Sequence, residues 1–179
     1  MRHQPTITTD RLVLRPFRLS DAPLVMEMAG DRAVYEMTLN IPHPYEEGMA
    51  EQWIATHASA FYEGKGVTLA ITLKEDDTLI GAIGMVASPD HNRAELGYWI
   101  GRPYWGNGYC TEAAVALIDY GLETLEYHKI DAHHLTKNPA SGRVMEKAGM
   151  TFEGELIDHV LKDDEYHTVR LYAIVRDPS

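Results

Sequence analysis

Two periods of hydrophobic and polar positions divide the chain into strands and helices. Residues 11–17 alternate between apolar and polar positions with a period of two, which is typical of a β-strand. Residues 45–62 place Met49, Trp53 and His57 at helical spacing on one face, which predicts an amphipathic helix. The remaining pattern predicts strands over residues 67–73, 78–87, 95–100, 129–135, 150–162 and 165–176, helices over 20–29, 109–125 and 139–148, and a short helical turn over 31–35.

The order of these elements and the segments between them indicate one domain. A strand, two helices, three strands, a helix, a strand, a helix and two final strands follow one another, which favours a mixed α+β sheet with helices packed on it. No linker rich in proline, serine or glycine interrupts the chain, and no repeat or low-complexity tract is present. A single-domain α+β fold is therefore expected.

The charge and the cysteine content narrow the classes of partner. The chain has 179 residues, with 16 basic and 27 acidic side chains and a net charge of −11. Such a surface repels nucleic acids and anionic membranes and suits cationic acceptors such as amines, although acidity also serves solubility alone. One cysteine excludes an internal disulfide framework, and neither a signal peptide nor an apolar run of about 18 residues is visible. These features favour a cytoplasmic enzyme or binding domain, with neither nucleic acid nor membrane as its partner.

A glycine-rich loop joins the strand at residues 95–100 to the helix at 109–125. Gly106 and Gly108 allow a tight turn, and the following helix presents free N–H groups and the positive end of its dipole. Together these features suit a phosphate or pyrophosphate group. Ordinary strand-to-helix turns also use glycine, and the loop is neither a dinucleotide fingerprint nor a P-loop. The loop alone therefore leaves both interpretations open.

Several segments, taken in chain order, carry the motifs of one superfamily. They are Thr9-Asp10-Arg11-Leu12-Val13-Leu14-Arg15-Pro16, Leu79-Ile80-Gly81, Glu95-Leu96-Gly97-Tyr98-Trp99-Ile100, Tyr104-Trp105-Gly106-Asn107-Gly108-Tyr109-Cys110-Thr111-Glu112-Ala113, and the stretch from Asn138 to Met150. The chain resembles the GNAT superfamily of acetyl-CoA-dependent N-acetyltransferases, and it is most similar to the branch of ribosomal-protein-alanine N-acetyltransferases. The resemblance covers residues 8–176, which would form a single GNAT N-acetyltransferase domain.

The resemblance implies a splayed sheet with acetyl-CoA in the gap between strands 95–100 and 129–135. Backbone groups of Trp99 and Ile100 would pair with the pantetheine amides, and Asn138 and Ser141 would lie near the pantetheine and the sulfur. The pyrophosphate would be held by N–H groups of Trp105, Gly106, Asn107, Gly108, Tyr109, Cys110 and Thr111, and the nucleotide phosphates by Arg143 and Lys147, which lie four residues apart on one helix face.

The loop departs from the common superfamily pattern at two positions. Trp105 stands where Arg or Gln is usual, although Trp is common in the resembled branch. Cys110 stands where Gly or Ala is usual, and its small side chain preserves the backbone path. A thiol at a helix N-terminus can have a lowered pKa, which raises the alternative of a nucleophile. Because no His or Asn partner surrounds it and the branch transfers acetyl directly, we interpret Cys110 as a small packed residue.

The implied reaction needs a neutral amine, and two residues are candidates for moving protons. Glu95 is the candidate base, acting through a water molecule, and Ser141 is the candidate acid for the departing thiolate. A salt-bridged surface glutamate and a serine in an ordinary first helical turn are the structural alternatives. An α-amine is easier to deprotonate than a lysine amine, so the expected acceptor is a protein or peptide N-terminus.

Other acceptors and other functions stay open. Acetylation of a small amine, such as an amino acid, a polyamine or an antibiotic, is the alternative within enzymes. A non-catalytic CoA-binding module is the alternative outside them, and the presence of both Glu95 and Ser141 argues against it. The protein would be a monomer or a homodimer. The candidates for lining the acceptor site are Tyr35, Met37, Tyr45 and Trp53, with Tyr166 and His167 on the last hairpin.

No metal site is expected. His133 and His134 are adjacent on a predicted strand, so their side chains point to opposite faces and are poorly placed to share a metal ion.

Overall fold

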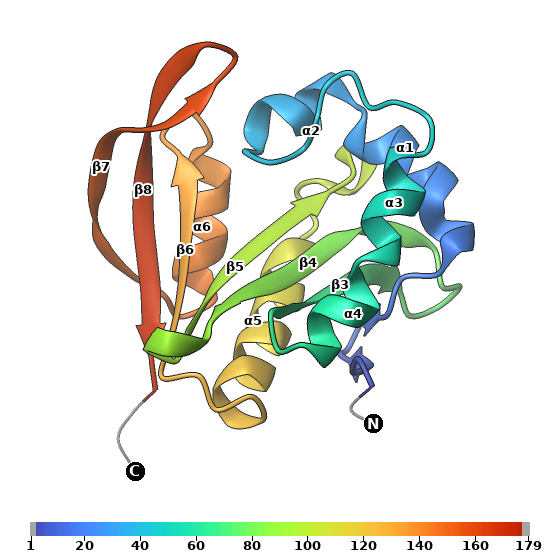
Figure 1. Ribbon diagram of the computed structural model, residues 1–179, viewed down its shortest axis with the longest axis horizontal. Helices are drawn as coiled ribbons and strands as arrows, with labels where there is room; N and C mark the ends of the chain where they lie inside the picture. Colours follow the sequence, from blue (N-terminus) through green and yellow to red (C-terminus); the bar gives the residue numbers. More distant parts are fainter. Residues whose placement is uncertain (1–2, 177–179) are drawn as a thin grey trace.

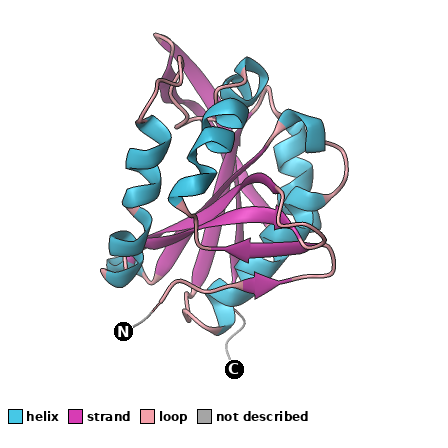
Figure 2. Ribbon diagram, turned by 90° about the vertical axis from the view of Figure 1, so that its right-hand side faces the viewer, coloured by secondary structure: helices cyan, strands magenta, loops and turns pink. Residues whose placement is uncertain are grey.

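The computed structural model describes residues 3–176 and contains one eight-stranded sheet with helices on both faces (Figures 1 and 2). The sheet order is β1-β2-β3-β4-β5-β6-β8-β7, and every neighbouring pair is antiparallel except β5 and β6. The strands are β1 Ile7–Thr8, β2 Leu12–Arg15, β3 Gly66–Leu73, β4 Leu79–Ser88, β5 Arg93–Ile100, β6 Lys129–Leu135, β7 Thr151–Lys162 and β8 Glu165–Val175. The expected mixed, splayed α+β sheet in one domain is confirmed.

Within the described residues, six α-helices cover the sheet, and two of them differ from the sequence prediction. The helices are α1 Ala22–Ala29, α2 Arg32–Met37, α3 Met49–Ala55, α4 His57–Tyr62, α5 Tyr109–Glu123 and α6 Pro139–Lys147. The prediction of a single helix over residues 45–62 was wrong, because the helix is interrupted at Thr56. The Thr56 hydroxyl donates to the Trp53 carbonyl at 2.7 Å, a local bond that competes with the helical ladder.

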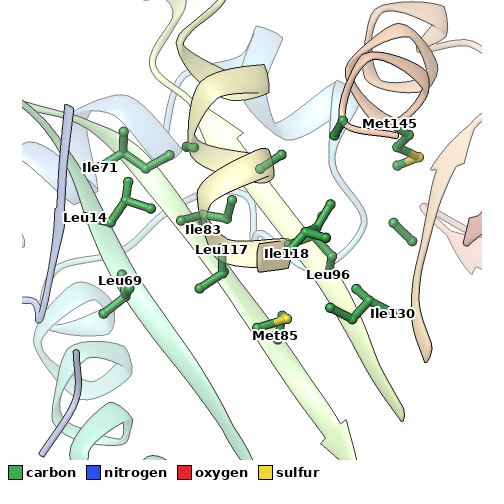
Figure 3. Close-up of a cluster of buried hydrophobic side chains, with 14 of the residues drawn as sticks. Leu14, Leu69, Ile71, Ile83, Met85, Leu96, Leu117, Ile118, Ile130 and Met145 are labelled. Atoms are coloured by element: carbon green, nitrogen blue, oxygen red, sulfur yellow. The ribbon is translucent and has the colours of Figure 1, made fainter. Parts of the chain in front are cut away.

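The main core lies between the sheet and α5. Leu117 and Ile118 on α5 pack against apolar side chains that project from the central strands (Figure 3). The strand residues in this layer include Leu14, Leu69, Ile83, Leu96 and Ile130, all of them buried. A second, smaller core lies on the opposite face, where α1 and α3 pack against β3 and β4. These two layers fix the central strands rigidly on both sides.

The two parallel strands, β5 and β6, pair over only part of their length. Their pairing comprises Arg93 with Lys129, Ala94 with Ile130, and Glu95 with Asp131. Beyond the last of these pairs the strands diverge, as Figure 1 shows. Each strand remains fully paired on its other side, β5 with β4 and β6 with β8. The sheet therefore opens at its middle while both halves stay intact.

Within residues 3–176, no helix combines the length and apolar character needed to cross a membrane.

Candidate functional site

The backbone of β5 determines which groups face the gap. Gly101 N–H donates to the Ile80 carbonyl at 2.8 Å, and Trp99 is paired with Ala82 on β4. Because neighbouring residues of a strand direct their backbone groups to opposite sides, those of Trp99 point to β4 and those of Tyr98 and Ile100 point to the gap. The prediction that Trp99 offers backbone groups to a ligand in the gap was therefore wrong, since its groups are used within the sheet.

The predicted partner Ile100 does border the gap. Its carbonyl accepts a hydrogen bond from the indole Nε1 of Trp105 at 2.7 Å. This bond folds the start of the glycine loop back onto the end of β5. The tryptophan that departs from the common superfamily pattern thus has a structural role in shaping the loop.

The glycine loop and the start of α5 present backbone N–H groups without side-chain caps. Gly106 and Gly108 have φ angles of +78° and +77°, which side chains other than glycine rarely adopt. Gly108 is the N-cap of α5, and it provides no side-chain cap. The first turn, Tyr109 to Thr111, precedes the first helical bond, which Glu112 N–H makes to the Gly108 carbonyl. This turn therefore has free donors that suit an anion.

Asn107, between the two glycines, stabilises the turn itself. Its Nδ2 donates to the carbonyls of Tyr104 and Trp105, each at 3.1 Å. The space around Gly106 is open, because apart from its chain neighbours no atom of the described residues lies within 4 Å of the position where a Cβ would be. The loop can thus accept a ligand beside Gly106 without displacing other residues.

Arg11 is a neighbour of this loop that sequence reasoning missed. Its Nη1 donates to the Asn107 carbonyl at 3.0 Å, and its guanidinium lies 4.7 Å over the Tyr109 ring. Its Nε forms an ion pair with Glu112 at 2.7 Å. The contacts join positions about a hundred residues apart, so no local pattern could reveal them. Arg11 adds a half-exposed positive charge beside the glycine loop.

Cys110 faces the interior. It packs against the core under α5, and burial raises the pKa of its thiol to about 12. The alternative in which the helix N-terminus lowers this pKa is not supported, because the loss of solvation raises it. A thiol in this state is not a nucleophile at neutral pH, which agrees with its interpretation as a small packed residue.

The start of α6 borders the gap on the side of β6. Asn138 is its N-cap, and the side-chain oxygen accepts from Ser141 N–H at 3.3 Å. Its Nδ2 donates to the Met37 carbonyl at the end of α2, at 3.1 Å. Tyr98 reaches from β5 to the same turn, where its hydroxyl donates to the Ser141 carbonyl at 3.1 Å and lies 3.0 Å from Ser141 Oγ. Ser141 is thereby held from both sides of the gap.

Burial raises the pKa of Tyr98 above its usual range, so its hydroxyl keeps its proton at neutral pH. Farther along α6, Arg143 and Lys147 are exposed, and within the described residues neither forms an ion pair. Two uncompensated positive charges near the gap contrast with the acidic composition of the chain.

Glu95 lies on the opposite face of the sheet from Tyr98. Its carboxylate is half exposed, and its Oε1 lies 3.5 Å from Nδ1 of His133 on β6. The adjacent Asp131 is buried, and its Oδ2 accepts from Arg93 at 2.8 Å. Glu95 therefore stands beside an imidazole at the point where the strands part. The adjacent His134 points to α6 and is buried, so the two histidines face opposite sides as predicted.

The candidates for the acceptor side separate into two groups. Trp53 and Tyr45 pack into the smaller core, where Trp53 contacts Phe17 and His57. Tyr35 and Met37 instead lie on α2, which contacts the tip of the β7–β8 hairpin. The ammonium of Lys162 at that tip donates to the carbonyls of Tyr35 at 2.5 Å and Thr38 at 2.6 Å.

The hairpin therefore meets α2 across the wide end of the gap. Burial lowers the pKa of Lys162, and its ammonium lies 3.8 Å from the centre of the Tyr35 ring. Tyr35 also donates to Asp163. On the same hairpin, Tyr166 is exposed and His167 is half-buried.

The arrangement is shared with known proteins. Residues 11–151 match the family model described as an acetyltransferase (GNAT) domain. The chain is 30% identical over 174 residues to the uncharacterized N-acetyltransferase YoaA of Bacillus subtilis (strain 168), with 96% of this chain and 97% of that protein covered. It is 27% identical over 179 residues to the ribosomal protein uS5-alanine N-acetyltransferase of Escherichia coli (strain K12), with 94% and 89% covered.

A solved structure shares the fold across its full length. It is a ribosomal L7/L12 alpha-N-protein acetyltransferase in complex with coenzyme A, with a TM-score of 0.88 and 19% sequence identity. The match covers 98% of this chain and 100% of that one. At this identity the likeness concerns the fold alone.

Proposed function

The chain belongs to the GNAT acetyltransferase family, and from this premise we propose that it transfers the acetyl group of acetyl-CoA to the N-terminal α-amine of a protein or peptide. We assign the activity to a domain spanning residues 8–176. The acceptor class is supported by the relative at 27% identity whose name gives an alanine of a ribosomal protein as its acceptor. The observation that carries the proposal is the parting of β5 and β6 after Glu95, beside Ser141.

The chemistry of amines favours an α-amine as the acceptor. Only a neutral amine can attack a thioester. Near pH 7, deprotonating a lysine side chain costs roughly 4–5 kcal/mol, whereas an α-amine costs about 1 kcal/mol. A site with one modest proton acceptor therefore handles an N-terminus more readily than a lysine.

The unpartnered donors of the gap and loop fit acetyl-CoA. Backbone groups of Tyr98 and Ile100 face the gap, where they can pair with amides. The uncapped N–H groups of Tyr109, Cys110 and Thr111 suit a pyrophosphate. Further cationic or hydrogen-bonding groups for the phosphates and pantetheine are Arg11, Arg143, Lys147 and Asn138, with Trp105, Gly106, Asn107 and Gly108 shaping the loop. When bound, acetyl-CoA supplies an activated acetyl thioester.

Glu95 and Ser141 are proposed to handle the protons on the two sides of the reaction. Glu95 removes the proton of the acceptor amine indirectly, through a group that lies between the amine and the carboxylate. Ser141 donates a hydrogen bond or proton to the departing thiolate, and Tyr98 holds the serine hydroxyl in place. Glu95 and Ser141 lie on opposite faces of the sheet, and each borders the opening between β5 and β6.

The proposal is tested by measuring thiol release from acetyl-CoA with two pools of acceptors. One pool contains short peptides with different N-terminal residues, and the other contains small primary amines, including polyamines and amino acids. We expect turnover with peptides. Turnover with small amines alone would overturn the proposed acceptor, and the absence of turnover with both pools despite tight acetyl-CoA binding would favour a non-catalytic binding module.

Two variants test the residue roles with a matched control. Glu95→Gln and Ser141→Ala are expected to lower kcat while acetyl-CoA affinity, measured by calorimetry, stays within about twofold; proton-transfer groups typically contribute about 10²- to 10⁴-fold. Glu123→Gln, an exposed glutamate at the end of α5, provides the control with unchanged kcat. Unchanged kcat in both site variants would contradict their assigned roles.

A further inference from the structure

An imidazole lies beside Glu95 where the two parallel strands part. Glu95 belongs to the last parallel pair, with Asp131, and His133 lies two residues beyond Asp131 on the same face of β6. Its Nδ1 is 3.5 Å from Glu95 Oε1, and its side chain retains 20% of its exposure. His133 therefore borders the first unpaired stretch of the gap and remains reachable from solvent.

The groups around His133 leave Glu95 as its one carboxylate partner. Asp131, on the same face of β6, is bound by Arg93 at 2.8 Å. The residue opposite His133 on β8 is Leu171, which is not titratable, and His167 lies farther along the same face of β8. Among the described residues, no hydrogen bond to Nε2 of His133 is present. One ring nitrogen thus faces a carboxylate and the other is free.

We propose that His133 is the group that takes the proton from the acceptor amine, with Glu95 as the carboxylate that orients it. The inference rests on the proposed acetyl transfer and names the intermediary between the amine and Glu95. A carboxylate that lies beside Nδ1 favours the tautomer with the proton on Nδ1, in which Nε2 carries the lone pair. Histidine is the side chain that most often serves as a general base.

The step balances with the residues present and the two substrates. The amine nitrogen forms a bond to the acetyl carbon, and the carbon–sulfur bond breaks. The proton lost by the nitrogen passes to Nε2 of His133, and the positive charge on the ring is balanced by Glu95. The departing sulfur takes a proton from Ser141 on the other side of the gap, and the serine regains a proton from solvent. The imidazole then releases its proton to solvent.

Substitution of His133 and rescue by free imidazole test this role. His133→Ala is expected to lower kcat by about 10²-fold or more, with acetyl-CoA affinity within about twofold of wild type. Added imidazole should restore part of kcat to His133→Ala and should leave Glu95→Gln unchanged. A merely structural role would give no such rescue. His159→Gln removes an exposed histidine from β7 and should leave kcat unchanged.

The pH profile gives a second and independent measurement. Wild-type kcat/KM should fall on the acidic side as the base becomes protonated, and this limb should disappear in His133→Gln. If His133→Gln retains kcat within about threefold and keeps the acidic limb, the inference is overturned while wild-type turnover leaves the proposed function intact. If His133→Ala loses the fold, seen by circular dichroism, the decision passes to His133→Gln. Wild type without turnover on any acceptor would contradict the proposed function itself.

Discussion

Glu112 connects the N-terminal turn of the chain to the start of α5, and its replacement by glutamine should weaken the fold measurably. The carboxylate accepts from Thr9 Oγ1 at 2.7 Å, from Arg11 N–H at 2.9 Å and from Arg11 Nε at 2.7 Å. Glu112 also lies in the first turn of α5, where a negative charge interacts favourably with the helix dipole. Glu112→Gln removes the charge and one acceptor oxygen while it preserves the size of the side chain.

The expected loss follows from the exposure of each partner. A hydrogen bond to a charged group contributes about 1.5–3 kcal/mol, but the ion pair with half-exposed Arg11 contributes only about 0–1 kcal/mol. Because glutamine keeps one acceptor, we expect Glu112→Gln to lower the free energy of unfolding by about 2 kcal/mol. For a chain of 179 residues, this corresponds to a fall in Tm of roughly 4–8 °C.

The same carboxylate makes the effect dependent on pH. Burial alone would raise the pKa of Glu112, but the hydrogen bonds from Thr9 and Arg11 outweigh it and hold the pKa below its ordinary value of 4.5. A carboxylate with a lowered folded pKa stabilises the fold above its unfolded pKa, and this contribution is lost as pH falls through the folded pKa. The difference in Tm between wild type and Glu112→Gln should therefore be full near neutral pH and should shrink below 4.5.

Thermal unfolding followed by circular dichroism at several pH values measures both expectations. Glu123→Gln, at the exposed C-terminal end of the same helix, is the matched control and should keep the wild-type Tm. A Glu112→Gln variant as stable as wild type near neutral pH would refute the assigned role of these hydrogen bonds. A difference in Tm that stays constant down to low pH would refute the electrostatic part of the argument.

Two groups with shifted pKa values give further predictions. Both ring nitrogens of His57 are buried and have no hydrogen-bond partner among residues 3–176, and burial lowers the pKa of His57 from 6.5 to about 4. Because the unfolded chain binds the proton more readily, stability should fall by about 3 kcal/mol as pH drops through this window. His57→Phe should flatten the dependence of Tm on pH there, and a curve parallel to wild type would contradict the argument. Cys110, with its raised pKa, should react with a thiol reagent near pH 8 much more slowly in the folded than in the unfolded protein, and equally rapid labelling of both would contradict the raised pKa.

Local signals predicted the elements that flank the glycine loop. Gly108 stands at the N-cap of α5 with a positive φ, and the apolar pattern that follows predicted the helix to within two residues of its observed end at Glu123. Asn138 caps α6 as its residue type suggests, and Gly149 follows that helix with a positive φ. These features depend on neighbours in the sequence, which is why they could be predicted.

Features that depend on distant contacts could not be predicted in this way. The interruption between α3 and α4 coincides with a hydrogen bond from the Thr56 hydroxyl to the Trp53 carbonyl, which the apolar spacing does not reveal. The direction of the Trp99 backbone depends on the register with β4. The contact of Lys162 with Tyr35 spans 127 residues, and the β7–β8 hairpin has two irregularities in its register. Long-range pairing decides each of these features.

The register of β5 in the sheet decides which of its side chains border the gap and on which face of the sheet they lie. Side chains alternate between the two faces of a strand, so a shift of β5 by one residue would turn Glu95 towards α5 and α6, where an unpaired carboxylate would be buried at high cost. It would also turn Tyr98 away from Ser141. The apolar residues Ala94 and Leu96, both buried against α5, oppose that shift. The hydrophobic core thus fixes the register, and the register places the Tyr98–Ser141 contact on one face of the sheet and Glu95 beside His133 on the other.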